Sequence, residues 1–286
     1  MRTLRPGQLA ELYVVQISTG ESRCVHRSST LLFEAPNWTV DGESLIVNGD
    51  GNLYRLPVAG GEFEQIDLGG VPEINNDHVL SPDGETVYVS AEDGHLYAVP
   101  LTGPPHTRRV SNDRGPGFHH YLHGISPDGK TLAYIGLENG RTNIYTIPAA
   151  GGIDEQITDD EYADDGSEYS PDGQWIYFNS ERASTTPGHA QLFRTSQGNT
   201  EQLTFDERVN WFPHPSPNGE TIAYVSFPPG TLGHPENVDD VRVRLLPASG
   251  SSPRDLATLY GGQGTMNVPS WSPDSTRLAY VAYPLT

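Results

Sequence analysis

The residues best suited to chemistry are polar side chains that lie shortly before a recurring Ser-Pro-Asp-Gly phrase or a close variant of it. They fall in five stretches: Asn75, Asn76, Asp77 and His78; His119, His120, Tyr121 and His123; Asp164, Asp165 and Glu168; Asn210, Trp211 and His214; and Asn267. Counted back from the phrase, His120, Asp164 and Asn210 occupy equivalent places, and so do Tyr121, Asp165 and Trp211. Equivalent strands of a ring would bring these side chains into one funnel around its axis.

Three interpretations fit this funnel. Imidazoles and carboxylates together can hold a divalent metal, with His120, His123 and Asp164 as the candidate ligands. One of the two histidines beside Asp164 or Asp165 would instead form an acid–base pair. The funnel would otherwise be a water-filled channel whose histidines are satisfied by hydrogen bonds. Alternation along a strand sends His119 and His123 to one side and His120 to the other, and the sequence leaves all three interpretations open.

Aromatic and cationic side chains add two more candidates. Trp211 and Tyr121 lie beside amide-rich neighbours, a combination that suits the apolar face and the hydroxyls of a sugar. Arg182 is a cation in a long loop, 180–189, and could grip a carboxylate. A second long loop, 227–240, enlarges the fifth repeat. Long loops in compact domains are often functional, so we expect both to lie at the funnel.

The turn phrase shows which elements position these residues. Its third position recurs at Asp41, Asp83, Asp128, Asp172, Asn218 and Asp274. The successive spacings are 42, 45, 44, 46 and 56 residues. Proline presets φ in such a turn, and a short apolar strand such as 131–135 follows it. A period near 44 with strand content predicts four-stranded propeller blades.

The two ends of the sequence complete each other. The last repeat supplies two strands, Asn267–Trp271 and Arg277–Tyr283, and the missing pair is Leu12–Ile17 and Arg23–His26. The prediction is an all-β, six-bladed β-propeller of four-stranded blades. It forms a single domain over residues 1–286, with the sixth blade built from about 265–286 plus 8–28.

The stretch Pro269-Ser270-Trp271-Ser272-Pro273-Asp274, followed by an apolar strand, resembles the repeats of TolB-type β-propellers. The resemblance covers nearly the whole chain, but the sequence as given has no counterpart of the α/β domain that precedes the propeller in TolB. That departure argues against the envelope role of TolB. Similar repeats occur in prolyl-oligopeptidase-like enzymes, which also need an α/β-hydrolase domain with G-x-S-x-G. They occur too in oligogalacturonate lyases, where the resemblance implies His-rich metal sites.

Charge and composition narrow the partners. The formal net charge of -20 would repel phosphate groups, so nucleic acid is not expected as a partner, and no apolar run predicts membrane insertion. No secretory signal is visible, so the sequence as given predicts a cytoplasmic protein, or a periplasmic one if a leader was removed. We expect a binding or interaction module that takes a small saccharide or a peptide segment of a protein partner in the funnel. The alternative is a carbohydrate-active enzyme, a lyase or hydrolase, with a His/Asp site that uses a divalent metal or none.

Overall fold

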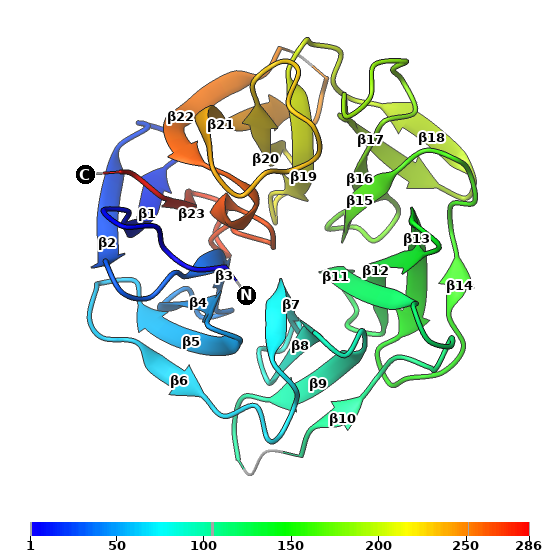
Figure 1. Ribbon diagram of the computed structural model, residues 1–286, viewed down its shortest axis with the longest axis horizontal. Coiled ribbons are helices and arrows are strands. Elements are labelled where there is room, and N and C mark those ends of the chain that lie inside the picture. Colours follow the sequence, from blue (N-terminus) through cyan, green and yellow to red (C-terminus); the bar gives the residue numbers. More distant parts are fainter. Residues whose placement is uncertain (1, 104–105, 251, 286) are drawn as a thin grey trace.

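The chain folds into a ring of six blades around a central axis (Figure 1), which confirms the predicted propeller. The computed structural model describes residues 2–103, 106–250 and 252–285. The first blade contains β3 (Glu34–Trp38), β4 (Ser44–Gly49), β5 (Asn52–Pro57) and β6 (Glu64–Ile66), and the second β7 (Ile74–Leu80), β8 (Thr86–Ala91), β9 (Leu96–Pro100) and β10 (Arg108–Arg109). The third contains β11 (His119–Ile125), β12 (Thr131–Glu138), β13 (Arg141–Pro148) and β14 (Glu155–Gln156). The fourth contains β15 (Asp164–Tyr169), β16 (Ile176–Ser180), β17 (Gln191–Ser196) and β18 (Asn199–Gln202), and the fifth β19 (Val209–Pro215), β20 (Thr221–Phe227), β21 (Val238–Pro247) and β22 (Arg254–Gly261).

The sixth blade is made from both ends of the chain, as the sequence predicts. Its sheet has the order β2 (Ser22–Ser28), β1 (Ala10–Gln16) and β23 (Arg277–Ala282). The inner place is taken by residues 267–271, which follow a short 3-10 turn, η1 (Gln263–Thr265). This segment is not the regular strand that the sequence predicts, since it joins β23 through a single Trp271–Leu278 bridge and the N–H of Ala279. Pro269 explains the irregularity, because proline cannot donate to a ladder.

The recurring phrase forms the turn that follows the C-terminal end of each inner strand. In the third blade the Ser126 hydroxyl donates to Asp128 (2.7 Å) and accepts from the N–H of Thr131 (3.0 Å). Gly129 takes a positive φ of 72°, a region that glycine enters without strain. The strands that follow the turns are buried on both faces, as at Leu132 and Tyr134, and the hydrophobic core lies between neighbouring blades.

All five regular inner strands contain a β-bulge. The register shifts within β3, β7, β11, β15 and β19, in each case near the middle of the strand. A bulge changes which face the following side chains point toward. Residues on either side of the bulge therefore do not follow one uninterrupted alternation.

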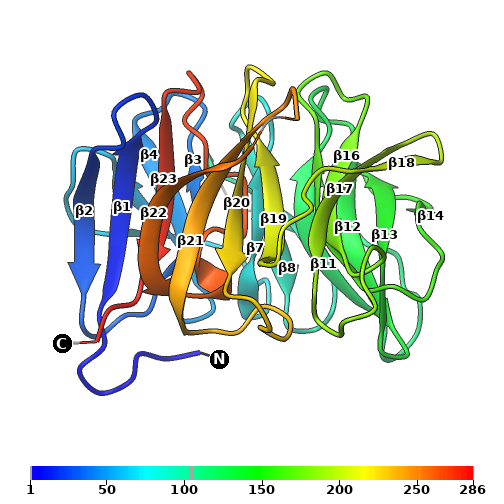
Figure 2. The same ribbon diagram turned by 90° about the horizontal axis from the view of Figure 1, so that it is seen from above.

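The mouth of the channel lies at the end where the inner strands begin. The arm before β1 and the loop between β20 and β21 both lie at this edge of the ring (Figure 2). Figure 1 shows the arm running toward the centre beside β3. Among the described residues, no helix is long and apolar enough to cross a membrane.

Candidate functional site

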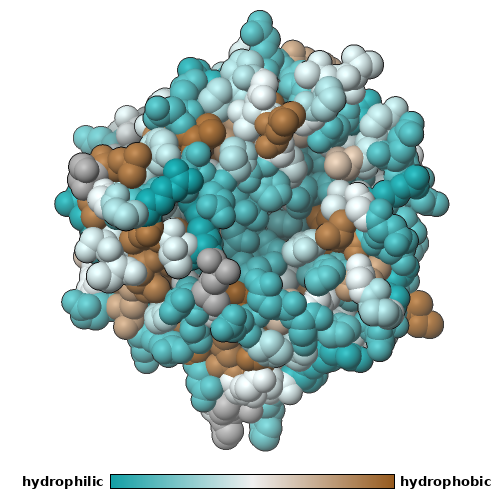
Figure 3. All heavy atoms as spheres, in the orientation of Figure 1, coloured by the Kyte–Doolittle hydropathy of each residue, from teal (hydrophilic) through white to brown (hydrophobic). Residues whose placement is uncertain are grey.

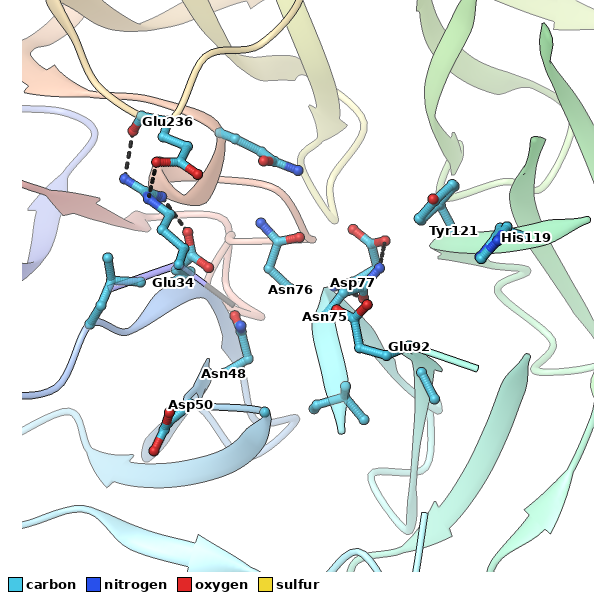
Figure 4. Close-up of a pocket in the computed structure, with 16 residues that line it drawn as sticks. Glu34, Asn48, Asp50, Asn75, Asn76, Asp77, Glu92, His119, Tyr121 and Glu236 are labelled. Atoms are coloured by element: carbon cyan, nitrogen blue, oxygen red, sulfur yellow. Dashed lines mark hydrogen bonds and ion pairs between the residues drawn. The ribbon is translucent and has the colours of Figure 1, made fainter. Parts of the chain in front are cut away.

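Two adjoining hollows form the mouth of the channel, each with a volume of about 320 Å³. Figure 3 shows the hollow at the centre of this face, lined mainly by hydrophilic residues. Asp77, Tyr121 and Gln263 line both hollows, so the two form one continuous site. The outer hollow, around Glu34, Asp50, Glu92 and Glu236, is rich in carboxylates (Figure 4).

A single ring of positions supplies much of this lining. Each member stands seven residues before the third residue of its turn phrase, and the six are Glu34, Asn76, Tyr121, Asp165, Trp211 and Asn267. All except Trp211 line one of the two hollows. Counting back from the turn therefore finds the lining, provided that the right position is counted.

The second hollow, called the inner hollow, is lined by residues that include Asp77, His123, Asp165 and Asn267. His123 is its charged centre. Its Nε2 lies 2.9 Å from Oδ1 of Asp165, and its Nδ1 lies 3.3 Å from the carbonyl oxygen of Asn267. Both partners are acceptors, so both ring nitrogens must donate and the ring is an imidazolium. Burial alone would lower the pKa of His123, but the carboxylates of Asp77 and Asp165 outweigh it and raise the pKa to about 9. The hydrogen bond from His123 overcomes the effect of burial on Asp165, whose pKa is lowered.

Asp77 is held beside this pair by two amides. Asn75 donates to Oδ2 of Asp77 at 2.7 Å, and Asn267 donates to Oδ1. The Asp77 carboxyl is buried, which raises its pKa, while the charge of His123 acts in the opposite direction. Figure 4 shows Asp77 pointing into the channel next to Asn75 and Asn76.

A second histidine–carboxyl pair, His214 and Glu168, joins the next two inner strands, β19 and β15. Nδ1 of His214 lies 2.5 Å from Oε2 of Glu168, and its Nε2 donates to the carbonyl oxygen of Met266 at 3.2 Å. Burial raises the pKa of Glu168, and the neighbouring His214 opposes that rise. Thus β15 supplies the acid of both pairs, and residues 266–267 supply both carbonyl acceptors.

Three of the predicted funnel residues point away from the axis, which corrects the register assumed from the sequence. His120, Asp164 and Asn210 are equivalent to one another, but all three are buried inside or between blades. Nδ1 of His120 lies 2.6 Å from the carbonyl oxygen of Gly94, and burial lowers the pKa of this ring to about 4. The side chain of Asn210 bonds to Asp206 and Ser226. Successive side chains of a strand point in opposite directions, so these three point into the blades and the residue after each of them points toward the channel.

The predicted metal ligands and Arg182 are likewise engaged elsewhere. Asp164 accepts from Nη2 of Arg182 at 2.9 and 3.0 Å, and Arg182 also pairs with Asp160. Its guanidinium therefore binds the protein's own carboxylates. The structure does not bring His120 and Asp164 to His123, and the described part of the chain contains no group of three His, Cys, Asp or Glu residues that could hold a metal ion.

Trp211 does not offer a stacking face. Its side chain is 7% exposed and packs against Phe212 and His234, whose ring centroid lies 4.5 Å away. Among the predicted aromatics Tyr121 remains, half-buried and close to parallel with His119 at 6.3 Å between centroids. His119, Asn75, Asn76 and Tyr121 all line the outer hollow.

The sequence interpretation missed Arg2, Glu34 and Glu236, which meet at the outer hollow. Glu34 could have been found, because it holds the ring position seven residues before Asp41. Arg2 and Glu236 lie in an arm and a loop outside the repeat. No pattern in the sequence indicates that they come together.

Comparison with known proteins gives consistent results. Residues 108–252 match the family model described as the TolB beta propeller domain. The uncharacterized protein Atu1656 of Agrobacterium fabrum (strain C58) is 40% identical over 281 residues, covering 96% of this chain and 92% of that protein. A solved structure of a candidate TolB from Agrobacterium tumefaciens is similar with a TM-score of 0.89 and 39% identity, covering 98% of this chain and 99% of that one.

More distant structures share the fold alone. Oligogalacturonate lyase from Vibrio parahaemolyticus is similar with a TM-score of 0.54 at 12% identity, covering 98% of this chain and 97% of that one. TolB from Acinetobacter baumannii has a TM-score of 0.59 at 17% identity, covering 96% of this chain and 64% of that chain. The family match and the close relatives, which agree with the six blades and their turn phrases, lead to one conclusion: the chain belongs to the TolB β-propeller family.

Proposed function

We propose that this protein is a binding module that takes a positively charged peptide segment into the mouth of its channel. The observation that carries the proposal is the composition of the outer hollow. Asp50 and Glu92 are exposed at its rim, and Arg2 is the one Lys or Arg among the described residues that line it. With the formal net charge of -20, this rim would attract a basic segment and repel an acidic one.

The walls favour a peptide over a saccharide. A sugar ring usually stacks on an exposed aromatic face, but Trp211 and Phe118 are buried and the half-buried Tyr121 lies close to parallel with His119. The side-chain amides of Asn48, Asn75, Asn76 and Gln263 line the outer hollow. Asn75 is bonded to Asp77 and Asn48 to Glu34. The amides of Asn76 and Gln263 are therefore the ones whose donors and acceptor suit the N–H and C=O groups of an extended backbone.

The state of His123 favours binding over acid–base catalysis. A general base needs a free lone pair within reach of substrate, and both ring nitrogens of His123 already donate to protein oxygens. Its side chain is 4% exposed. The pair with Asp165 therefore serves to fix the wall of the inner hollow.

Calorimetric titration with a blocked peptide, acetyl-Gly-Lys-Gly-Lys-Gly-amide, tests the proposal. The same peptide with both lysines acetylated, and maltohexaose, are the comparison ligands. Of these three ligands, we expect only the charged peptide to bind, and we expect added salt to weaken its binding. The Glu92→Gln/Asp50→Asn variant should weaken it about fivefold.

Glu85→Gln is the matched control variant, because Glu85 is an exposed acid of the same blade in the turn at the opposite end of the inner strand. It should bind the charged peptide as the unmodified protein does. Equal binding of the charged and the acetylated peptide, or binding of maltohexaose alone, would overturn the proposal.

A further inference from the structure

We propose that the outer hollow contains a subsite for an arginine side chain, and that Arg2 of the chain itself occupies this subsite. The inference rests on the proposed function and deepens it. It names arginine as a recognised residue of the partner segment, and it identifies the arm before β1 as the segment that this partner must displace.

The contacts around Arg2 are those of a guanidinium site. Nη1 of Arg2 forms an ion pair with the carboxylate of Glu34. Nη2 donates to the carbonyl oxygen of Glu236 at 2.5 Å and to Oδ1 of Asn237 at 3.2 Å. The guanidinium carbon lies 4.3 Å from the ring centroid of Tyr283. A planar group with several divergent donors satisfies all of these partners at once, whereas the ammonium of lysine is a compact point charge.

The walls of this subsite are built into the ring. Glu34 lies on β3, and the hydroxyl of Tyr283 donates to the carbonyl oxygen of Phe33 at 3.1 Å. Glycines give the walls their close approach. A Cβ on Gly264 would lie 2.1 Å from Oε1 of Glu34, and a Cβ on Gly262 would lie 2.0 Å from the carbonyl oxygen of Glu236. The walls that Glu34 and Tyr283 supply are therefore fixed by the ring, while Asn237 is also held by Nε2 of Gln8, which donates to its Oδ1 at 2.8 Å.

Glu34 gives the subsite its preference for a cation. Its side chain is 10% exposed, and burial raises the pKa of its carboxyl while Arg2 opposes that rise. A buried carboxylate that loses its partner is strongly unfavourable. When Arg2 leaves, Glu34 must take up a proton or accept another cation.

The arm that delivers Arg2 is held by Leu4, which packs against the hydrophobic core, and by Gln8, whose Nε2 donates to Oδ1 of Asn237 and to the carbonyl oxygen of Tyr283. Thr3, Arg5 and Pro6 are exposed, and regular structure begins only at β1. Gln8 fixes the base of the arm through a bridge to Leu285. Because Arg2 is tethered, an external arginine competes with an effective concentration in the millimolar range. A partner that also uses the acidic rim can win this competition.

The test uses the full chain with Arg2→Ala, and its probe is N-acetyl-arginine amide. We expect this probe to raise the melting temperature of the Arg2→Ala variant with increasing concentration, because a ligand of the folded state stabilises it. The unmodified protein should respond about tenfold more weakly or not at all. N-acetyl-lysine amide and N-acetyl-citrulline amide should not reproduce the effect.

Two further variants keep the test decisive. Arg2→Ala/Glu34→Gln removes both partners, so it should fold without a buried unpaired carboxylate and should no longer respond to the probe. Arg5→Ala changes an exposed arginine of the same arm and should behave as the unmodified protein. The inference is overturned if Arg2→Ala shows no response, or if the response survives in the double variant.

These outcomes separate the subsite from the proposed function. If the lysine peptide binds but N-acetyl-arginine amide has no effect on Arg2→Ala, the module binds basic peptides without an arginine subsite. If the probe acts on Arg2→Ala while no basic peptide binds the unmodified protein, the subsite stands and the module function fails.

Discussion

The imidazole of His123 donates to the carboxylate of Asp165 across the boundary between two blades, with 2.9 Å between Nε2 and Oδ1. β11 carries the histidine and β15 the acid, so the pair joins neighbouring inner strands within the channel. Its charges are buried among fixed partners. Protonation of this one ring is therefore coupled to the stability of the propeller.

The stability of the protein should decrease as the pH rises toward 9. The pKa of His123 is raised from an ordinary value of 6.5 to about 9 in the folded protein. A raised pKa contributes stability that is complete below about 6.5 and is lost as the pH rises through 9, and this shift corresponds to about 3 kcal/mol at most. Urea unfolding at pH 6 and pH 9.5 measures the difference. The His123→Gln variant should show a smaller decrease over this interval, and an unchanged decrease would contradict the assignment.

Asp165→Asn should lower the pKa of His123. The substitution removes a negative charge and the carboxylate acceptor while leaving Asp77 in place, so the imidazolium loses part of its stabilisation. Titration of the His123 ring signals by NMR should give a pKa well below 9. Asp128→Asn is the control, because Asp128 is an exposed acid in a turn at the other end of the channel. A His123 pKa that stays near 9 in Asp165→Asn would assign the shift to Asp77 instead.

Ser126→Ala should destabilise the protein by about 1–2 kcal/mol, because the hydroxyl both donates and accepts within its turn. Removing it leaves the N–H of Thr131 without its partner. Ser29→Ala, which changes an exposed serine of the connection before β3, should have little effect. Denaturant midpoints of the two variants check the prediction, and equal midpoints would show that the turn serines are not structural.

Gly262→Ala should weaken the contacts around Arg2 by displacing the loop that carries Glu236. Gly262 has an extended backbone, with φ of -178°, so the cost of this substitution comes from space alone. A Cβ there would lie 2.0 Å from the carbonyl oxygen of Glu236, and the backbone must move. We expect the free energy of unfolding to fall by about 1–3 kcal/mol, and the amides of the loop that carries Glu236 to exchange hydrogen faster.

Gly230→Ala provides the comparison in the same loop. No atom lies within 4 Å of its Cβ position, although its φ of 81° makes the substitution moderately strained. It should cost stability without changing the surroundings of Arg2. If the two variants gave the same exchange pattern around residues 236–237, close packing at Gly262 would not be the cause.

The sequence predicts the ring better than the site. Six turn phrases with regular spacing indicate the blades, and the strands at the two ends indicate how the ring closes. The side-chain direction at the start of each inner strand could not be read from spacing alone. Alternation separates His120 from His123, as the sequence indicates, but the spacing does not show which of the two faces turns toward the channel. The equivalence of His120, Asp164 and Asn210 was therefore predicted correctly, while the face on which they lie was not.

Arg2 and Glu236 could not be predicted for a different reason. They lie outside the repeat, so no counting rule relates them to Glu34. Their meeting depends on how an arm and a loop cross the mouth, and the sequence contains no periodic pattern for either. Functional contacts on irregular segments escape an argument built on periodicity.

The sixth blade links the mouth of the channel to the place where the two ends of the chain close the ring, the pairing of β1 with β23. β1 pairs with β23, and the arm that continues from β1 carries Arg2 to Tyr283, which directly follows β23. Beyond this pairing, the N–H of Leu9 donates to the carbonyl oxygen of Pro284, and Gln8 forms a bridge with Leu285. The contacts that close the ring thus continue directly into the contacts of the arm at the mouth. Separation of β1 from β23 and release of Arg2 from its site are therefore linked equilibria. A ligand that displaces Arg2 also removes contacts that stabilise the closed ring.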